Sequence, residues 1–314
     1  MLALLAPGQG AQTPGFMTPW IEFFASTGMG EISNGAMAKW SEVSGLDLAR
    51  LGTTADADEI RDTANAQPLL LLGALTGAGA LFAGDASSIS VVAGHSVGEI
   101  AAAALAQVLD AEQAFALVSA RGREMAKAAS GSNTGMSAVL GGERDVVVAH
   151  LASLGLTPAN ENGGGQIVAA GSMDALAALA ENPPAGARVR PLQVSGAFHT
   201  SVMQPAVEAV RAVAAGLELH DSQFKVLSNK DGAVLDDKNE IMSRIVGQIA
   251  GPVRWDLCMQ TLADLGVTGV IELPPAGTLC GLIKRAQPSI ETFALKGPED
   301  LEAAREFIAK HGGK

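Results

Sequence analysis

Short apolar runs alternate along the chain with longer segments in which apolar residues recur at helical spacing. The apolar runs predict buried strands at residues 2–6, 90–93, 225–228 and 267–272. The longer segments predict helices at residues 35–50, 66–82, 99–109, 111–129, 203–215 and 298–311, with Asp110 as an N-cap. Strands that alternate with helices in this way are typical of an α/β fold.

Residues 130–196 follow a different pattern. Strands are predicted at 135–140, 157–160, 166–170 and 188–194, and helices at 143–154 and 173–180. The resulting order, β-α-β-β-α-β, is that of a ferredoxin-like unit. Linkers rich in Gly, Ser and Asn flank this unit at residues 130–135 and 195–196. We therefore predict a small domain at 130–196, inserted into a large α/β domain formed by 1–129 and 197–314.

Composition and charge narrow the class of protein. The chain has 314 residues, of which 48% are hydrophobic and 17% charged, so it can bury a substantial core and is not disordered. Lys and Arg total 21 against 33 Asp and Glu, which gives a formal charge of −12. This excess of acidic residues argues against a nucleic-acid-binding protein and against docking on anionic lipid, because both require a basic face.

One uncharged run, at residues 68–84, carries Gly73 and Gly77 at the spacing of a GxxxG motif. The run is shorter than the roughly 20 apolar residues that a membrane span needs, and it lacks aromatic and basic anchors. We therefore expect a buried helix and no membrane contact.

The remaining signals of compartment are few. The first residues have no basic stretch ahead of their apolar run, so no secretory signal is predicted. Cys258 and Cys280 have neither CxxC spacing nor a nearby histidine cluster, so we expect buried thiols and no metal site. The sequence predicts a cytoplasmic protein.

Residues 94–98 form a G-x-S-x-G pattern with the sequence Gly-His-Ser-Val-Gly. In a chain with 37 glycines such a pattern alone is weak, but here a predicted strand precedes it and a predicted helix follows it. That context is typical of a nucleophile elbow, a sharp turn that exposes its serine. We predict Ser96 as a nucleophile and the Val97 N–H as an oxyanion donor. The alternative is a strand-to-helix turn that merely contains a serine.

A serine nucleophile needs a base, and His199 is the best placed of the five histidines. It follows the predicted strand 188–194 and precedes the helix 203–215, so it lies on a loop at the carboxyl end of a strand, where α/β proteins bind ligands. The side chain of His95 should diverge from the adjacent Ser96. The other three histidines lie in a helix, a polar connection and the C-terminal tail: His150, His220 and His311. The alternative role for His199 is capping or packing.

Arg121 shares an otherwise apolar helical stripe with Val118 and Met125. An arginine at such a position rarely stays unpaired, and its fork suits a carboxylate. From spacing alone, a bound substrate carboxylate and an internal ion pair remain equally open.

The turn at residues 7–12, Pro-Gly-Gln-Gly-Ala-Gln, follows the first predicted strand. It is not a dinucleotide fingerprint, because Thr13 stands where the third glycine belongs. A turn of this kind can place the Gln9 N–H beside the Ser96 elbow as a second oxyanion donor.

These motifs together resemble the malonyl-CoA:acyl carrier protein transacylases, the acyltransferase family of fatty-acid and polyketide synthesis. The resemblance extends over nearly the whole chain and rests on six motifs in register, at residues 7–12, 66–68 (Ala-Gln-Pro), 94–99, 121–122 (Arg-Gly), 196–199 (Gly-Ala-Phe-His) and 252–255 (Pro-Val-Arg-Trp). It implies an α/β-hydrolase-like large domain with an inserted ferredoxin-like small domain. The sequence departs from the family pattern at Gly251 and at residues 274–277 (Pro-Pro-Ala-Gly).

The resemblance also implies a ping-pong acyl transfer from malonyl-CoA to the phosphopantetheine thiol of acyl carrier protein, through a malonyl-serine. The CoA thioester and the phosphopantetheine thiol are both substrates, and no cofactor or metal is implied. The residue roles that it implies are the nucleophile Ser96, the base His199, the oxyanion donors Gln9 and Val97, the carboxylate clamp Arg121, the histidine-orienting carbonyl of Gln248 and the malonyl-selective Phe198.

Acyl carrier proteins are strongly acidic, so an enzyme of net charge −12 needs a local basic patch to dock one. We predict that patch at Arg188, Arg190, Lys284 and Arg285, with scattered solvated charges as the alternative. Two other functions stay open, a serine hydrolase acting on acyl thioesters and a non-catalytic carrier-protein docking subunit. No assembly segment is evident, and we expect a monomer.

Overall fold

The large domain is built on a six-stranded sheet in the order β11-β10-β1-β2-β7-β8, parallel except at the β7–β8 pair. The computed structural model describes residues 1–83, 85–194 and 196–312, so Gly84 and Ser195 of the predicted segments lie outside the described residues. The strands of this sheet are β1 (Leu2–Ala6), β2 (Ile89–Gly94), β7 (Lys225–Leu227), β8 (Val234–Leu235), β10 (Gly269–Glu272) and β11 (Glu291–Ala294).

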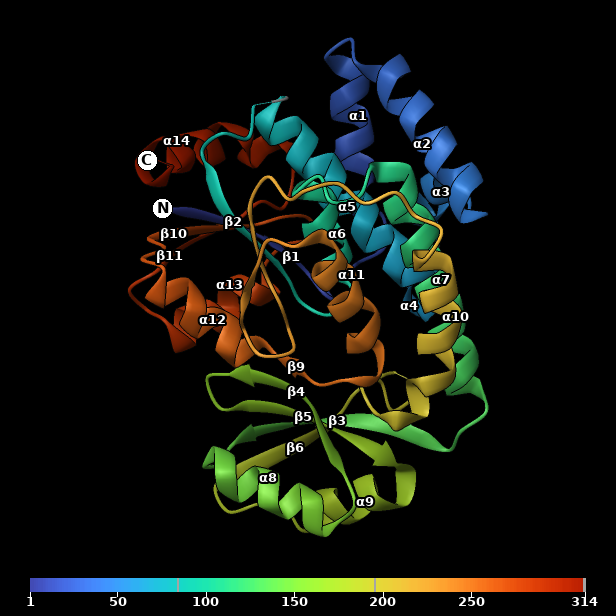
Figure 1. Cartoon of the computed structure of the whole chain (residues 1–314), viewed down its shortest axis with the longest axis vertical. Coiled ribbons are helices and arrows are strands. Elements are labelled where there is room, and N and C mark those ends of the chain that lie inside the picture. The colour runs from blue at the N-terminus through green and yellow to red at the C-terminus, as the bar shows by residue number, and fades with distance from the viewer. Residues whose placement is uncertain (84, 195, 313–314) are drawn as a thin grey trace.

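Helices cover both faces of this sheet (Figure 1). Alternate residues of β1 point to opposite faces, so Leu2 and Leu4 join one apolar core while Ala3 and Leu5 join another. Because both faces are buried, the strand is continuously apolar. The helices of the large domain are α1 (Thr18–Ser26), α2 (Gly30–Ser44), α3 (Leu48–Thr53), α4 (Ala57–Arg61), α5 (Thr63–Phe82), α6 (Gly98–Leu105), α7 (Ala111–Ser130), α10 (Gln204–Ala214), α11 (Lys238–Gly247), α12 (Trp255–Asp264), α13 (Thr278–Ala286) and α14 (Leu301–His311), with 3-10 turns η1 (Ser201–Met203), η2 (Gln248–Ala250) and η3 (Pro298–Asp300).

Most predicted elements are present, with ends shifted by a few residues. Asp110 caps α7 through a capping box with Gln113, as predicted. The single helix predicted at 35–50 is wrong: α2 ends at Ser44, because Gly45 adopts a left-handed conformation with φ 70°, and α3 begins after a turn. Elements with short or weakly periodic sequences were not predicted: α1, α4, α11, α12, α13, β8, β9 and β11.

Helix α5 is the buried helix that the sequence predicts. It is long and apolar enough to span a membrane, but 72% of its most hydropathic window is buried inside the protein. Gly73 and Gly77 lack side chains, which lets Pro274 pack closely against this helix. A Cβ on Gly77 would lie 2.4 Å from the Pro274 ring. The GxxxG spacing therefore serves packing within the domain.

The small domain has its own sheet, in the order β6-β3-β5-β4-β9, with helices α8 (Arg144–Ser153) and α9 (Met173–Glu181) packed on it through a separate apolar core. Its strands are β3 (Thr134–Gly141), β4 (Thr157–Gly163), β5 (Gln166–Ser172), β6 (Ala187–Pro191) and, from the large domain, β9 (Val253–Arg254). The first four strands have the ferredoxin-like order. The parallel pairing of β4 with β9 joins this sheet to the large domain. In Figure 1 the small domain lies below the large one.

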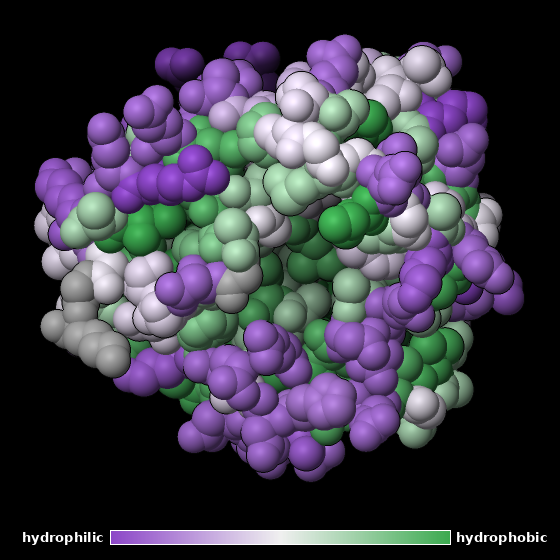
Figure 2. Space-filling view, turned by 90° about the horizontal axis from the view of Figure 1, so that it is seen from above, coloured by the Kyte–Doolittle hydropathy of each residue, from purple (hydrophilic) through white to green (hydrophobic). Residues whose placement is uncertain are grey.

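The end of the molecule away from the small sheet is mostly hydrophilic at its rim, with apolar residues visible in a hollowed middle (Figure 2). The cavity described next lies instead where the small sheet meets the large one.

Candidate active site

Ser96 lies on a sharp turn between β2 and α6. Its φ is 55°, a left-handed conformation that non-glycine residues adopt at a cost of about 1–3 kcal/mol. Both glycines of the motif are required by close backbone contacts: a Cβ on Gly94 would lie 1.9 Å from the carbonyl of Gly98, and one on Gly98 would lie 2.3 Å from the Ala6 oxygen. The G-x-S-x-G pattern thus forms the predicted elbow.

His199 lies against this elbow. Its Nε2 is 2.9 Å from Ser96 Oγ, and its Nδ1 is 2.9 Å from the backbone oxygen of Gln248. Because a carbonyl oxygen only accepts, Nδ1 carries the proton and Nε2 presents its lone pair to the serine hydroxyl. Burial, and secondarily the positive charge of Arg121, lowers the pKa of His199 to about 3, so the imidazole is neutral and able to accept a proton at pH 7.

Arg121 on α7 is almost completely buried behind the serine, with an exposure of 1%. Its guanidinium donates to the side-chain oxygens of Gln67 at 2.7 Å and Gln248 at 2.8 Å, and to Ser96 Oγ at 3.2 Å. Within the described part of the chain no carboxylate lies within 4 Å of it, so amide oxygens hold the fork in place of an internal ion pair. Burial lowers the pKa of Arg121 to about 10, which leaves it charged at neutral pH.

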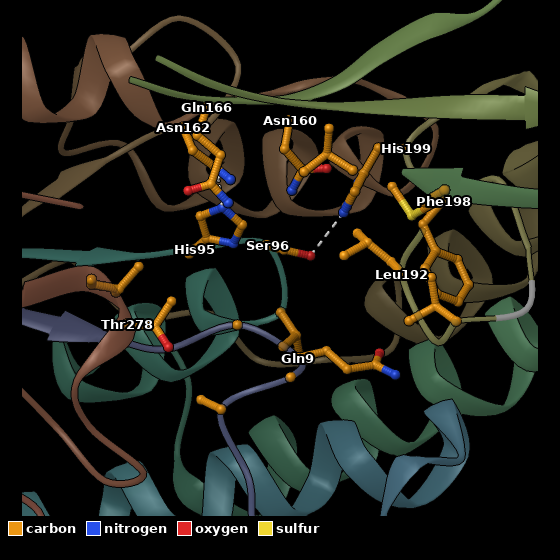
Figure 3. A pocket seen from close by; sticks show the side chains of 18 of the residues that line it. Gln9, His95, Ser96, Asn160, Asn162, Gln166, Leu192, Phe198, His199 and Thr278 are labelled. Atoms are coloured by element: carbon orange, nitrogen blue, oxygen red, sulfur yellow. Dashed lines mark hydrogen bonds between the residues drawn. The ribbon is translucent and has the colours of Figure 1, made fainter. Parts of the chain in front are cut away.

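A cavity of about 250 Å³ opens over Ser96 and His199 between the two sheets. Residues of the large domain, including Gln9 and Thr278, line one side, and residues of the small sheet, including Asn160, line the other (Figure 3). Val97 also lines the cavity. Across the described residues, the backbone N–H groups of Gln9 and Val97 donate to no protein group. They are therefore available to a ligand oxygen beside the serine.

The other pocket histidine, His95, turns away from the serine as predicted. Its Nε2 is 2.8 Å from Asn162 Oδ1 (Figure 3). Its ring packs edge-on against Trp255. Phe198, next to the base, is buried and also lines the cavity. Five of the predicted site residues thus line one cavity: Gln9, Ser96, Val97, Phe198 and His199. The other two, Arg121 and Gln248, lie behind it and hydrogen-bond to Ser96 and His199.

Residues 6–302 match the family model of the acyl transferase domain. The malonyl CoA-acyl carrier protein transacylase of Mycobacterium tuberculosis (strain ATCC 25618 / H37Rv) is 49% identical over 304 residues, which cover 96% of this chain and 98% of that protein. The chain belongs to the malonyl CoA-acyl carrier protein transacylase family.

Solved structures of transacylases have the same fold. A crystal structure of the Mycobacterium tuberculosis enzyme superimposes with a TM-score of 0.89 at 48% identity, covering 96% of this chain and 99% of that one. A malonyl-transacylase in complex with its type II PKS acyl-carrier protein gives a TM-score of 0.88 at 29% identity, covering 98% and 99%. The predicted α/β fold with a large and a small domain is therefore confirmed.

Sequence reasoning missed several polar residues of this transacylase site. The Ala-Gln-Pro motif gave Gln67 no role of its own, yet its side-chain oxygen accepts a hydrogen bond from Arg121. Asn160 and Asn162 line the cavity from β4, and Asn229, which follows β7, contacts the elbow from beneath. Asn229 directly follows a predicted strand, and polar residues at the carboxyl ends of parallel strands are the one signal that could have singled it out.

Proposed function

We propose that this chain transfers the malonyl group of malonyl-CoA to the phosphopantetheine thiol of acyl carrier protein, supplying extender units for fatty-acid or polyketide synthesis. The observation that carries the proposal is the contact between Ser96 Oγ and a neutral His199, beside a buried and charged Arg121. A nucleophile, a base and a carboxylate partner then meet at one point, which is what malonyl transfer requires.

In the first half-reaction, His199 Nε2 takes the proton of the Ser96 hydroxyl as Oγ attacks the thioester carbon. The oxygen of the tetrahedral intermediate becomes negative and accepts from the Gln9 and Val97 N–H groups, since both residues line the cavity and neither N–H has an acceptor among the described residues. The C–S bond then breaks, the imidazolium returns its proton to the departing sulfur, and CoA leaves as a thiol. The product is malonyl-Ser96.

In the second half-reaction, the same groups act in reverse order on a new acceptor. His199 deprotonates the phosphopantetheine thiol, whose sulfur attacks the acyl-serine carbon, and the serine oxygen leaves with the proton from His199. The Gln248 carbonyl keeps the imidazole in the same tautomer throughout, because it accepts only from Nδ1–H.

The free carboxylate of the malonyl group pairs with Arg121. The guanidinium is held in a fixed orientation by Gln67 and Gln248, so the clamp needs little reordering when substrate binds. Phe198 narrows the acyl end of the cavity and favours an unbranched malonyl group over one with an α-methyl substituent.

The acidic carrier protein docks beside the cavity mouth. Arg188 and Arg190 are exposed on β6, and both point away from the small core that their neighbour Val189 joins. They thus extend the cavity-facing side of the small sheet. Across the mouth, Lys284 and Arg285 are exposed at the end of α13.

Charge reversal tests this docking patch. Lys284→Glu is expected to raise the KM for carrier protein several-fold while the KM for malonyl-CoA changes less, because it removes a steering charge without touching Ser96. Lys225→Glu at the start of β7, an exposed lysine with no ion pair among the described residues, is the matched control. Equal effects of the two substitutions would remove Lys284 from the patch.

We also propose that the enzyme is a cytoplasmic monomer that needs no cofactor. All groups of the proposed mechanism come from one chain, and malonyl-CoA and the phosphopantetheine thiol are its substrates. Dialysis against a chelator is expected to leave the rate unchanged, and light scattering is expected to give the mass of one chain. A dimer mass, or activity lost with the chelated metal, would contradict these two points.

Intact mass spectrometry after brief mixing with malonyl-CoA tests the central proposal. A malonyl-sized adduct is expected on the native chain, and none on Ser96→Ala. Addition of acyl carrier protein should discharge the adduct much faster than water does. An adduct that water clears as quickly would identify a hydrolase, and the absence of any adduct would leave a non-catalytic docking subunit.

A further inference from the structure

The network beneath the elbow points to a role for Asn229, which does not touch the cavity. Asn229 is fully buried after β7, whose pairing with β2 brings the carboxyl ends of the two strands together. Its carboxamide oxygen accepts from the Ser96 backbone N–H at 2.7 Å, and its amide nitrogen donates to the Gly94 oxygen at 2.8 Å. One side chain therefore bridges both limbs of the turn.

The same oxygen also bonds to Gln248, which in turn contacts His199 and Arg121. Gln248 Nε2 donates to Asn229 Oδ1 at 3.2 Å, while the backbone oxygen of Gln248 accepts from His199 and its side-chain oxygen accepts from Arg121. Asn229 is thus hydrogen-bonded both to the serine backbone and to the residue that orients the histidine.

Asn229 is itself held on both sides of its backbone. Its N–H donates to Glu99 Oε1 at 2.7 Å, and its carbonyl accepts from the Arg254 N–H at 2.7 Å. Glu99 lies in the first turn of α6, so the helix that follows the serine also holds the asparagine beneath it. All the polar groups of Asn229 are therefore satisfied by elements that surround the elbow.

We propose that Asn229 is a positioning residue for acyl transfer, which holds the left-handed backbone of Ser96 and the side chain of Gln248 in one fixed arrangement. The Ser96 N–H is fixed, so rotation about its N–Cα bond is restrained, and Oγ stays in line with His199. The neighbouring Val97 stays at the cavity wall, where its N–H is the proposed oxyanion donor. Without the carboxamide, the strained turn can relax and carry Oγ away from the imidazole.

The test is Asn229→Ala, compared with Cys258→Ala. Cys258 is equally buried and lies 3.7 Å from the Asn229 amide, but it contacts neither Ser96 nor Gln248. A displacement of the nucleophile by about 1 Å costs roughly 10²-fold, so kcat for malonyl transfer by folded Asn229→Ala is expected to fall by about that factor. The KM for malonyl-CoA should change less than about threefold, because Gln67 still holds Arg121.

The second readout is the rate at which an organofluorophosphonate labels Ser96. This probe contains neither malonyl nor CoA, so it reports on the serine, the base and the oxyanion donors even if the proposed function, on which the inference rests, fails. The labelling rate is expected to fall about 10²-fold in Asn229→Ala and to stay near the native rate in Cys258→Ala. Native labelling by folded Asn229→Ala, or an equal loss in Cys258→Ala, would overturn the proposal.

Amide hydrogen exchange of the native chain covers the case in which Asn229→Ala does not fold. The Ser96 N–H is expected to be protected from exchange by its bond to Asn229. The Val97 N–H, which has no acceptor in the described part of the chain, is expected to exchange faster. Rapid exchange at Ser96 would overturn the proposal without any variant, and protection at Ser96 alone would support it.

Discussion

Replacing Arg121 by alanine should separate malonyl transfer from acetyl transfer. The guanidinium is 1% exposed and hydrogen-bonds to two glutamine oxygens and to Ser96 Oγ. In the acyl-enzyme it would face the malonyl carboxylate. Its removal would leave that carboxylate buried and unpaired, which costs about 3–5 kcal/mol.

That cost corresponds to a loss of about 10²- to 10⁴-fold in kcat/KM for malonyl-CoA. Acetyl-CoA has no carboxylate, so its transfer by Arg121→Ala is expected to stay within about tenfold of the native rate. Arg121→Lys keeps the positive charge but loses the two-pronged geometry of the guanidinium, so its kcat/KM for malonyl-CoA should lie between those of the native enzyme and Arg121→Ala. The assay is the initial rate of transfer to carrier protein from each acyl-CoA, on protein whose melting temperature shows that it is folded.

Acetyl-CoA is also the internal control, because Arg121 contacts Gln248, whose carbonyl orients His199. If Arg121 acted only by supporting that geometry, both substrates would lose the same factor. Equal losses for malonyl and acetyl transfer would therefore refute the clamp.

Three further outcomes follow from the same contacts. Burial, and then the charge of Arg121, lowers the pKa of His199 to about 3, so kcat/KM should begin to fall with decreasing pH only well below pH 6.5. Arg121→Ala removes the second cause and should raise the pH at which this fall begins. A fall centred at pH 6.5 in the native enzyme would contradict this prediction. Burial raises the pKa of Glu99 from 4.5 to about 8, so between these two pH values the native state holds a proton that the unfolded state has released. The free energy of unfolding should therefore fall by about 1.4 kcal/mol per pH unit as the pH rises through this range. Denaturant unfolding of Glu99→Gln should show a shallower fall, and parallel pH profiles of the two proteins would exclude this role of Glu99. Gly98→Ala should abolish malonyl transfer, because the new Cβ would clash with the Ala6 oxygen. Gly79→Ala is the control and should stay active, because no atom lies within 4 Å of its new Cβ. Native malonyl transfer by Gly98→Ala would show that the elbow tolerates a side chain at this position.

Local structure was predictable from the sequence wherever a short pattern encodes it. The apolar run at β1, the capped helix α7 and the two glycines around Ser96 each specify a conformation through neighbouring residues. The helix predicted at 35–50 was wrong because the apolar period continues past Gly45, while that one residue adopts a left-handed conformation and ends the helix. Short elements such as β9 carry too few residues to show a period.

By itself the sequence determined the alternation of strands and helices, the elbow at Ser96 and the acidic balance of the chain, since each depends on neighbouring residues or on composition. Only the tertiary structure decided which groups meet there. His199 is 103 residues from Ser96 along the chain, and Asn229 is 133 residues from it. Contacts over such separations are set by the order in which β1, β2 and β7 pair and by the burial that holds them together. No local pattern contains that information, so neither the amide pairing of Arg121 nor the place of Asn229 beneath the elbow could be derived from spacing.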